Sequence, residues 1–439
     1  MISFLVFGAG KSSVYLIEYL NNYCLQNQLN ITVCDKNTAT IESIINKNES
    51  LNYKNIDIFE TESVLELIKY SQIVVSLLPA NLHIHIAKMC LELGKHFCSA
   101  SYISEEMMAL NDAVKQKKLI FLNEIGLDPG IDHISAMKIF DEIRIKGGVI
   151  KSFKSFCGGL VADECDGDNP WKYKFTWNPT NVVLAGQGNP AIYKQNNKLK
   201  IRPYQQLFKK VYPFKMDAIS DLEGYPNRDS LKYIDAYKLH NIDTMIRGTL
   251  RKIGYSEAWN VLVNIGLTDN SLILNMPKNT SIKQWVEMYL PLDFKELPAY
   301  FDCSQDIIEK LNFIGFNSDE KLGVLKGTSA QILEEVLTRK WQLLPEDKDL
   351  IVMIHDIDYE FEGKTHNIKS NLVLKGESSQ KTAMAKTVGL PLAISAKLIF
   401  ENKITSSGVL MPLKEEFYNP ILKELAQHQI IFKEIETIL

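Results

Sequence analysis

A glycine-rich turn near the N-terminus places the strongest constraint on the fold. Gly8-Ala9-Gly10 stands between an apolar run, Ile2–Phe7, and a segment with helical periodicity, Lys11–Asn22. The first glycine permits a tight strand-to-helix turn, and the second lets the backbone approach a pyrophosphate at the positive end of the helix. Ser13 replaces the usual third glycine and is small enough to keep helix and strand close. The turn therefore predicts a dinucleotide site.

Alternating β-rich and helical segments continue to about residue 125 and support this interpretation. Five more strand-like runs follow Ile2–Phe7: Asn30–Cys34, Tyr53–Asp57, Gln72–Leu77, His96–Ala100 and Leu119–Asn123. Helical segments separate them at Thr38–Lys47, Ser63–Tyr70, Leu82–Leu93 and Glu105–Lys117. Regular alternation with short links predicts an α/β fold with a Rossmann-type, doubly wound parallel sheet.

Beyond Gly126 the pattern changes, and we expect an α+β substrate domain with a helical insertion. The expected division is a dinucleotide-binding domain at 1–130, a substrate-binding domain at 131–280 and about 346–390, and a mainly helical domain at 281–345. Strand-like pieces of the substrate domain are Lys151–Cys157, Val182–Leu184, Leu272–Leu274, Asp349–His355 and Asn371–Lys375. The closing segment, Ser379–Leu439, reads as mostly helical, and its helices at about 390–439 are expected to pack back on the first domain.

Composition excludes several classes of protein. A formal net charge of -4 gives no electrostatic case for nucleic acid or an anionic membrane as a partner. The longest apolar runs are far shorter than the roughly 20 residues of a membrane span. Seven cysteines, an odd number without a C-x-x-C pair, fit reduced thiols in a cytoplasmic protein. Since no cluster of His, Cys and carboxylates has zinc-like spacing, we expect no metal.

Asp35 ends the second predicted strand, where a carboxylate can accept hydrogen bonds from the adenosine ribose and repel a 2′-phosphate. This favours NAD over NADP. The neighbouring Lys36 would tolerate the phosphate and keeps NADP open. The alternative for Asp35 is a helix N-cap or a solvated loop acid.

Three further strand ends carry polar groups, and loops at strand carboxyl ends bind ligands in such sheets. They are Ser76-Leu77-Leu78-Pro79, Ala100-Ser101-Tyr102 and Gly126-Leu127-Asp128-Pro129-Gly130. Their hydroxyl, phenol and carboxylate groups indicate a site for nicotinamide and substrate. The alternative is that each strand end carries these residues only because they form turns, Pro129-Gly130 especially.

Arginine is scarce and clustered. Only six of the 49 basic residues are arginine, and Arg228, Arg247 and Arg251 fall within one short stretch. Local arginine in a lysine-rich chain indicates a need for the planar bidentate fork that binds carboxylates. The sharper interpretation is a polycarboxylate substrate; the alternative is a structural ion-pair cluster with Asp229 and Asp235. Cys157, beside two glycines, is either a core thiol or a point of close ligand approach.

At these residues the sequence resembles the saccharopine dehydrogenases of the glutamate-forming type, over essentially the whole chain. The resemblance rests on the glycine turn, on the strand ends at 76–79 and 100–102, and on Asn123–His133, Cys157–Leu160, Tyr173–Phe175, Tyr225–Ser230, Arg247–Arg251 and Ala383–Pro391. It departs from the family at Leu160–Glu164, where both usual prolines are missing. NADP-using fungal members carry arginine near Asp35 and animal-type members use NAD, which also favours NAD here.

The resemblance implies reversible, nicotinamide-dependent oxidation of saccharopine to glutamate and 2-aminoadipate 6-semialdehyde through an imine, in lysine metabolism. It leaves open whether lysine is made or broken down, and suggests a homodimer. Expected acid/base candidates are Asp128, Tyr102 and Cys157, in that order. Expected cofactor-binding residues are Gly8, Gly10, Lys11, Ser12, Asp35, Ser76, Leu77, Leu78, Ala100, Ser101, Leu127, Asp128, Pro129 and Phe175. Expected substrate-binding residues are Ser101, Tyr102, Asp128, Arg228, Arg247, Gly248 and Thr249. The alternatives are a related imine-reducing enzyme, such as a carboxynorspermidine dehydrogenase, or a non-catalytic nucleotide-binding protein of the same fold.

Overall fold

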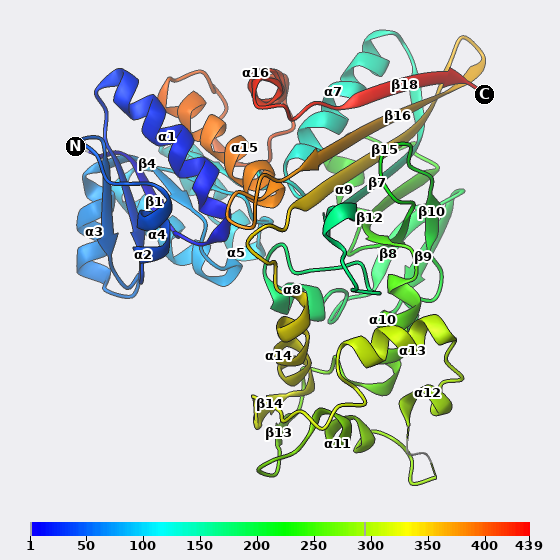
Figure 1. The fold of residues 1–439 in the computed structure, drawn as a ribbon. Coiled ribbons are helices and arrows are strands. Elements are labelled where there is room, and N and C mark those ends of the chain that lie inside the picture. The colour runs from blue at the N-terminus through cyan, green and yellow to red at the C-terminus, as the bar shows by residue number, and fades with distance from the viewer. Residues whose placement is uncertain (1, 294–295) are drawn as a thin grey trace. The chain divides into compact units, whose positions relative to one another are not determined.

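The computed structural model describes residues 2–293 and 296–439 (Figure 1) and divides into two compact units. Unit 1 comprises Met1–Gly148 and Gln380–Phe432, and unit 2 comprises Val149–Ser379 and Lys433–Leu439. The three-domain division expected from the sequence stays a prediction. Each unit is described by itself.

Unit 1 contains a seven-stranded parallel sheet in the order β17-β6-β5-β4-β1-β2-β3. Its strands are β1 (Ile2–Phe7), β2 (Ile31–Asp35), β3 (Leu51–Asn55), β4 (Ser71–Ser76), β5 (His96–Ser99), β6 (Ile120–Leu122) and β17 (Gly408–Leu410). Its helices are α1 (Val14–Asn27), α2 (Ala39–Ile44), α3 (Thr61–Lys69), α4 (His83–Leu93), α5 (Glu105–Met108), α6 (Asn111–Gln116), α7 (Ile131–Ile145), α15 (Ala383–Phe400) and α16 (Glu415–Gln427). The order reverses at β1, between β2 and β4, so the predicted doubly wound fold is confirmed.

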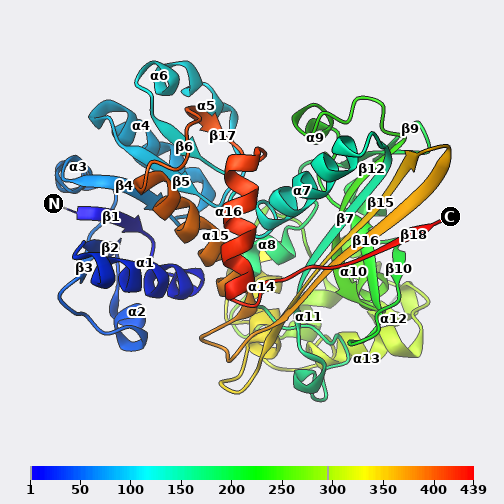
Figure 2. The same ribbon diagram turned by 90° about the horizontal axis from the view of Figure 1, so that it is seen from above.

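Alternating side chains of β1 place apolar groups on both faces of this sheet. Leu5 and Phe7 join the core cluster on one face. On the other, Phe4 meets Phe400 of α15 with ring centroids 5.1 Å apart. Figures 1 and 2 show α15 beside α1 within this unit. Helix α15 is long and apolar enough to cross a membrane, but 78% of its length is buried inside the protein, as in the core helix of a globular unit.

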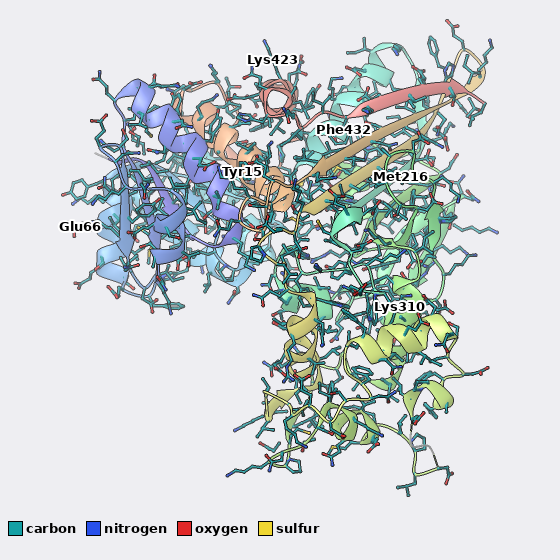
Figure 3. All side chains as sticks on the ribbon, in the orientation of Figure 1. Tyr15, Glu66, Met216, Lys310, Lys423 and Phe432 are labelled. Atoms are coloured by element: carbon teal, nitrogen blue, oxygen red, sulfur yellow. The ribbon has the colours of Figure 1, made fainter. Side chains whose placement is uncertain are left out.

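Helix α15 also approaches the glycine turn closely. A Cβ on Gly389 would lie 3.1 Å from both Leu16 N and Ser12 O, so glycine lets the helix pack against the start of α1 without displacing its backbone. The ammonium groups of Lys381 and Lys386 lie over the ring of Tyr15, which is labelled in Figure 3, at 5.9 and 5.8 Å from the ring centre. The C-terminal part of the chain therefore supports the turn from outside the strand–helix repeats.

Unit 2 is built on a mixed sheet whose main path runs β10-β11-β12-β7-β15-β16-β18, with β8 pairing β12 and β9. Its strands are β7 (Val149–Val161), β8 (Ala191–Gln195), β9 (Lys198–Arg202), β10 (Tyr212–Phe214), β11 (Leu222–Pro226), β12 (Thr244–Lys252), β15 (Asp349–Phe361), β16 (Lys364–Lys375) and β18 (Lys433–Ile438). Its other elements are α8 (Pro179–Val183), α9 (Lys232–Ala236), α10 (Tyr255–Ile265), α11 (Ile282–Glu287), α12 (Leu297–Tyr300), α13 (Gln305–Phe313), α14 (Ser329–Trp341), and the β13 (Ile273–Asn275) and β14 (Lys326–Thr328) pair. An aromatic core with Trp171, Trp259, Trp285 and Trp341 joins the helices to the sheet.

Several local predictions were wrong. Val182 and Val183 were expected in a strand but lie in α8, because Asn178 caps the helix by accepting from Thr180 N and Pro179 occupies its first turn. The segment Glu105–Lys117 forms two short helices rather than one. The closing segment contributes two strands, β17 and β18, besides its helices.

Candidate functional site

The two glycines of the turn, Gly8 and Gly10, are needed for different structural reasons. Gly8 has φ +106°, and a Cβ there would lie 2.9 Å from the carbonyl carbon and oxygen of Leu77, so the position admits only glycine. At Gly10 a Cβ would meet nothing within 4 Å, which leaves the backbone open on that side. Ser13 is buried and its hydroxyl donates to Gly10 O at 2.8 Å. The turn thus fits a pyrophosphate over Gly10 at the start of the helix.

Asp35 at the end of β2 is tied to the chain's own backbone. Its Oδ2 accepts from Ala9 N at 2.7 Å, and its Oδ1 accepts from Asn37 N at 3.2 Å. The carboxylate therefore closes the glycine turn onto the neighbouring strand. Lys36 next to it forms an ion pair with Asp57 at 3.0 Å, and 67% of the Lys36 side chain is exposed.

A histidine that sequence reasoning missed joins the ends of β4 and β5. Nδ1 of His83 lies 2.8 Å from Ser76 Oγ, and its Nε2 lies 2.8 Å from Ser101 Oγ. Burial lowers the pKa of His83 to about 4, so the imidazole is neutral near neutral pH. One ring nitrogen then donates and the other accepts, which orients both hydroxyls. A histidine at the start of a helix after a strand-end serine was the only sequence signal for it.

The two leading acid/base candidates lie together. The phenol of Tyr102 donates to Oδ1 of Asp128 at 3.1 Å, although 26 residues separate them. Both side chains are partly exposed. Gly126 and Gly130 close the loop that carries Asp128, since Gly126 N donates to Pro129 O at 2.8 Å. A carboxylate beside a phenol at the carboxyl edge of the sheet can accept and return a proton.

In unit 2 the predicted substrate residues gather around β12. This strand runs antiparallel to β11 and parallel to β7, and the register sets Thr249 opposite both Tyr225 and Cys157. The guanidinium of Arg247 lies 4.3 Å from the ring centre of Tyr233. Arg228, in the loop after β11, is exposed and adopts φ +53°. Gly248 is required by packing, because a Cβ there would lie 2.2 Å from the ring of Phe156.

Arg251, the third arginine of the cluster, is a core residue. Its side chain lies among Tyr173, Tyr225 and Tyr255, with ring centres 5.0 to 6.0 Å from the guanidinium carbon. It is 4% exposed. Burial raises the pKa of the three phenols, and the cation acts in the opposite direction. The aromatic cage stabilises this buried charge through cation–π contacts.

Two other predicted residues of unit 2 are buried in packing. Cys157 is 8% exposed, and a Cβ on the adjacent Gly158 would lie 2.8 Å from Leu250 Cβ, so this glycine serves strand packing. Phe175 is 5% exposed and packs its ring against Tyr173 and Trp341. Their roles at a ligand stay predictions.

Apart from Phe175, the predicted site residues fall into two groups, one in each unit. The first group, at the strand ends of unit 1, comprises Gly8, Gly10, Lys11, Ser12, Asp35, Ser76, Leu77, Leu78, Ala100, Ser101, Tyr102, Leu127, Asp128 and Pro129. The second group, on and beside β12, comprises Cys157, Arg228, Arg247, Gly248 and Thr249. Among residues 2–293 and 296–439, no group of three or more His, Cys, Asp or Glu side chains could hold a metal ion.

The doubly wound parallel sheet and its glycine turn define a dinucleotide-binding α/β protein. The chain carries in addition a second unit built on a mixed sheet. Comparison with known families narrows this class. The model of the saccharopine dehydrogenase NADP binding domain matches residues 4–122, and that of the saccharopine dehydrogenase C-terminal domain matches residues 126–431. The chain belongs to the saccharopine dehydrogenase family.

Individual relatives agree with the family models. Saccharopine dehydrogenase [NADP(+), L-glutamate-forming] of Saccharomyces cerevisiae is 30% identical over 447 residues, 99% of each chain. A solved structure of the apo, histidine-tagged yeast enzyme matches with a TM-score of 0.89 at 29% identity and covers 100% of both chains. Mitochondrial alpha-aminoadipic semialdehyde synthase of Rattus norvegicus is 32% identical over 99% of this chain, which spans 48% of that relative's length.

The expectation that NAD is the favoured cofactor is wrong. The family model over residues 4–122 describes an NADP-binding domain, and the yeast relatives carry NADP(+) in their names. Asp35 misled the sequence interpretation because its two oxygens accept backbone N–H groups of Ala9 and Asn37. A carboxylate needed to close the turn is no signal against a 2′-phosphate.

Proposed function

We propose that this chain is an L-glutamate-forming saccharopine dehydrogenase that uses NADP. The observation that carries the proposal is its likeness to the yeast enzyme of that name over 99% of both chains. The glycine turn supports it, because Gly8 and Gly10 suit a dinucleotide pyrophosphate. The pairing of Tyr102 with Asp128 at the same edge of the sheet supplies acid/base groups.

In the oxidative direction, the residues of the glycine turn would hold NADP⁺, which would supply the acceptor for the hydride that leaves the former lysine ε-carbon of saccharopine. The secondary amine loses its proton as the C=N bond of an imine forms. Water then adds to the imine carbon, and the C–N bond breaks to release glutamate and 2-aminoadipate 6-semialdehyde. The balance is one saccharopine, one NADP⁺ and one water consumed, and one NADPH and one proton formed.

The protein's part is to hold the substrate and move protons. We assign Asp128 as the group that takes the proton from the amine and activates water, with Tyr102 fixing its carboxylate through the 3.1 Å hydrogen bond. We assign Ser101, whose hydroxyl lies 2.8 Å from Nε2 of His83, to the same site. Arg228 and Arg247 are assigned to substrate carboxylates, which suit the fork of a guanidinium.

One assay tests the proposal. The purified chain is mixed with saccharopine and NADP⁺, and reduced nicotinamide is followed by absorbance, with glutamate measured as the second product. We expect both to form in equal amounts. A parallel assay with carboxynorspermidine tests the related imine-handling activity. No turnover of saccharopine would contradict the proposal.

We also propose that the protein is a cytoplasmic homodimer, on the basis of the seven free cysteines and the family resemblance.

A further inference from the structure

Three buried ionisable side chains adjoin Tyr102 and Asp128 without belonging to the predicted site. Glu124, Asp132 and His133 are 2%, 2% and 0% exposed. Nε2 of His133 lies 3.0 Å from Glu124 Oε2, and its Nδ1 lies 3.6 Å from Asp132 Oδ2. We name these three residues the buried clamp. They stand in the same stretch of sequence as Asp128, Asn123–His133.

Glu124 holds the backbone on both sides of Tyr102. Its Oε1 accepts from Ile103 N at 3.0 Å, and its own N–H donates to Ser101 O at 3.0 Å. The residue adopts φ +54°, a left-handed conformation that is uncommon for a glutamate. The strained backbone of Glu124 and both hydrogen bonds therefore fix the direction in which the side chain of Tyr102 projects from the backbone.

Asp132 holds the backbone on both sides of Asp128. Its Oδ1 accepts from Gly130 N at 2.6 Å, and its N–H donates to Leu127 O at 3.1 Å. Gly130 has φ +145°, where a Cβ would lie 2.1 Å from Gly126 O. His133 lies between the two carboxylates, hydrogen-bonded to Glu124 at 3.0 Å and 3.6 Å from Asp132, so its ring packs between the groups that hold the two loops.

A gain in folding stability alone does not explain why three ionisable side chains are buried together. Taking charged or strongly polar groups out of water is unfavourable, and well-packed apolar residues often stabilise a core equally well. What the buried clamp provides is a fixed geometry between the loop that carries Tyr102 and the loop that carries Asp128. Reacting groups must be held within fractions of an ångström of the productive position.

We propose that Glu124, His133 and Asp132 are positioning residues that hold the phenol of Tyr102 against the carboxylate of Asp128. The proposal rests on the proposed function, since it gives these two groups a task in proton transfer. His133 is 0% exposed, so in this proposal it acts through Glu124 and Asp132. Its loss should separate Tyr102 from Asp128 while leaving the glycine turn in place.

The test uses His133→Gln, His133→Leu and Glu124→Gln in the full chain. Glu124→Gln keeps an acceptor for Ile103 N but weakens the link to His133, so it should fold even where His133→Leu does not. His85→Gln is the matched control, because the imidazole of His85 contacts Ile58 O and the ring of Phe59, which lie outside both loops. We expect kcat with saccharopine to fall roughly 10- to 100-fold in the clamp variants. The KM for NADP⁺ should stay within about twofold, and the control should behave as the parent chain.

A second readout does not depend on activity. The phenol-carbon resonance of Tyr102, assigned with Tyr102→Phe, reports the hydrogen bond to Asp128, and we expect it to move in all three clamp variants but not in His85→Gln. If the resonance and kcat stay unchanged in folded Glu124→Gln and His133→Gln, the proposal is overturned. If the parent chain fails to turn over saccharopine, the proposed function falls, and the Tyr102 resonance alone decides the positioning role.

Discussion

The Oδ2 atom of Asp35 accepts a hydrogen bond from the backbone N–H of Ala9 at 2.7 Å. This contact joins the end of β2 to the glycine turn after β1. Because it holds the segment between Gly8 and Gly10, we expect cofactor affinity to depend on it.

Removing the Asp35 carboxylate should therefore loosen the turn. We expect Asp35→Ala to lower the free energy of unfolding by about 1–2 kcal/mol, as for loss of a charge-assisted hydrogen bond. The dissociation constant for NADPH should rise several-fold. Asp57→Ala is the control for stability, since its ion pair with Lys36 is exposed and contributes little. If Asp35→Ala unfolds and binds NADPH like the parent chain, the contact is dispensable.

The two glycines of the turn should respond differently to alanine. Gly8→Ala introduces a Cβ 2.9 Å from the Leu77 backbone at φ +106°, so it should destabilise unit 1 by about 1–3 kcal/mol. Gly10→Ala meets no protein atom within 4 Å and should leave the melting temperature nearly unchanged. It should nevertheless weaken NADPH binding at least tenfold by occupying the space of the pyrophosphate. Fluorescence titration and thermal unfolding separate the two effects; normal binding by Gly10→Ala would contradict the assigned site.

Local signals explain why the first unit was predictable. The glycine turn and the alternating segments are short-range patterns, and they were sufficient for the doubly wound sheet. Strand β12 was missed because Arg247, Arg251 and Lys252 make it look polar, yet they are 7%, 4% and 2% exposed. Their charges are compensated by aromatic rings and by Asp163 and Asp166, which lie far away in sequence.

The candidate site was predictable only in part, for a related reason. Tyr102 and Asp128 could be proposed from strand ends and the family resemblance. The role of His83 depends on Ser101, 18 residues later, and that of Glu124 on His133 and Ile103. Such partnerships form only when several strand ends meet, so no periodicity or spacing announces them.

Tyr102 and Asp128 should act as one unit in catalysis. Asp128→Asn should lower kcat about 10²–10⁴-fold, as for loss of a general base. Tyr102→Phe should lower it by about tenfold, because only the orienting hydrogen bond is lost. The double variant should be no slower than Asp128→Asn alone, since the tyrosine has no carboxylate left to orient. Steady-state kinetics of the four proteins check this, and strictly multiplicative effects would mean that the two groups work independently.

Arg228 should matter for substrate and not for cofactor. Arg228→Met removes the fork proposed to bind a substrate carboxylate, so the KM for saccharopine should rise at least tenfold at constant KM for NADP⁺. Arg202→Met is the matched control, because Arg202 lies in the same unit and bonds to Lys210 O and Tyr193. An equal change in both variants would point to a general charge effect.

Burial of His83 should make unit 1 sensitive to acid. Its pKa is about 4 in the folded protein, against an ordinary value of 6.5, so the unfolded chain binds the proton more tightly. The stability that comes from the neutral imidazole is present above pH 6.5 and is lost as the pH falls toward 4, by about 2 kcal/mol at pH 5. We expect His83→Gln, which keeps a polar group near Ser101 but cannot take up a proton in this range, to be less stable than the parent at pH 7. Between pH 7 and 5 it should lose less stability than the parent. Denaturant unfolding at a series of pH values measures both slopes, and parallel curves would show that His83 does not set the acid sensitivity.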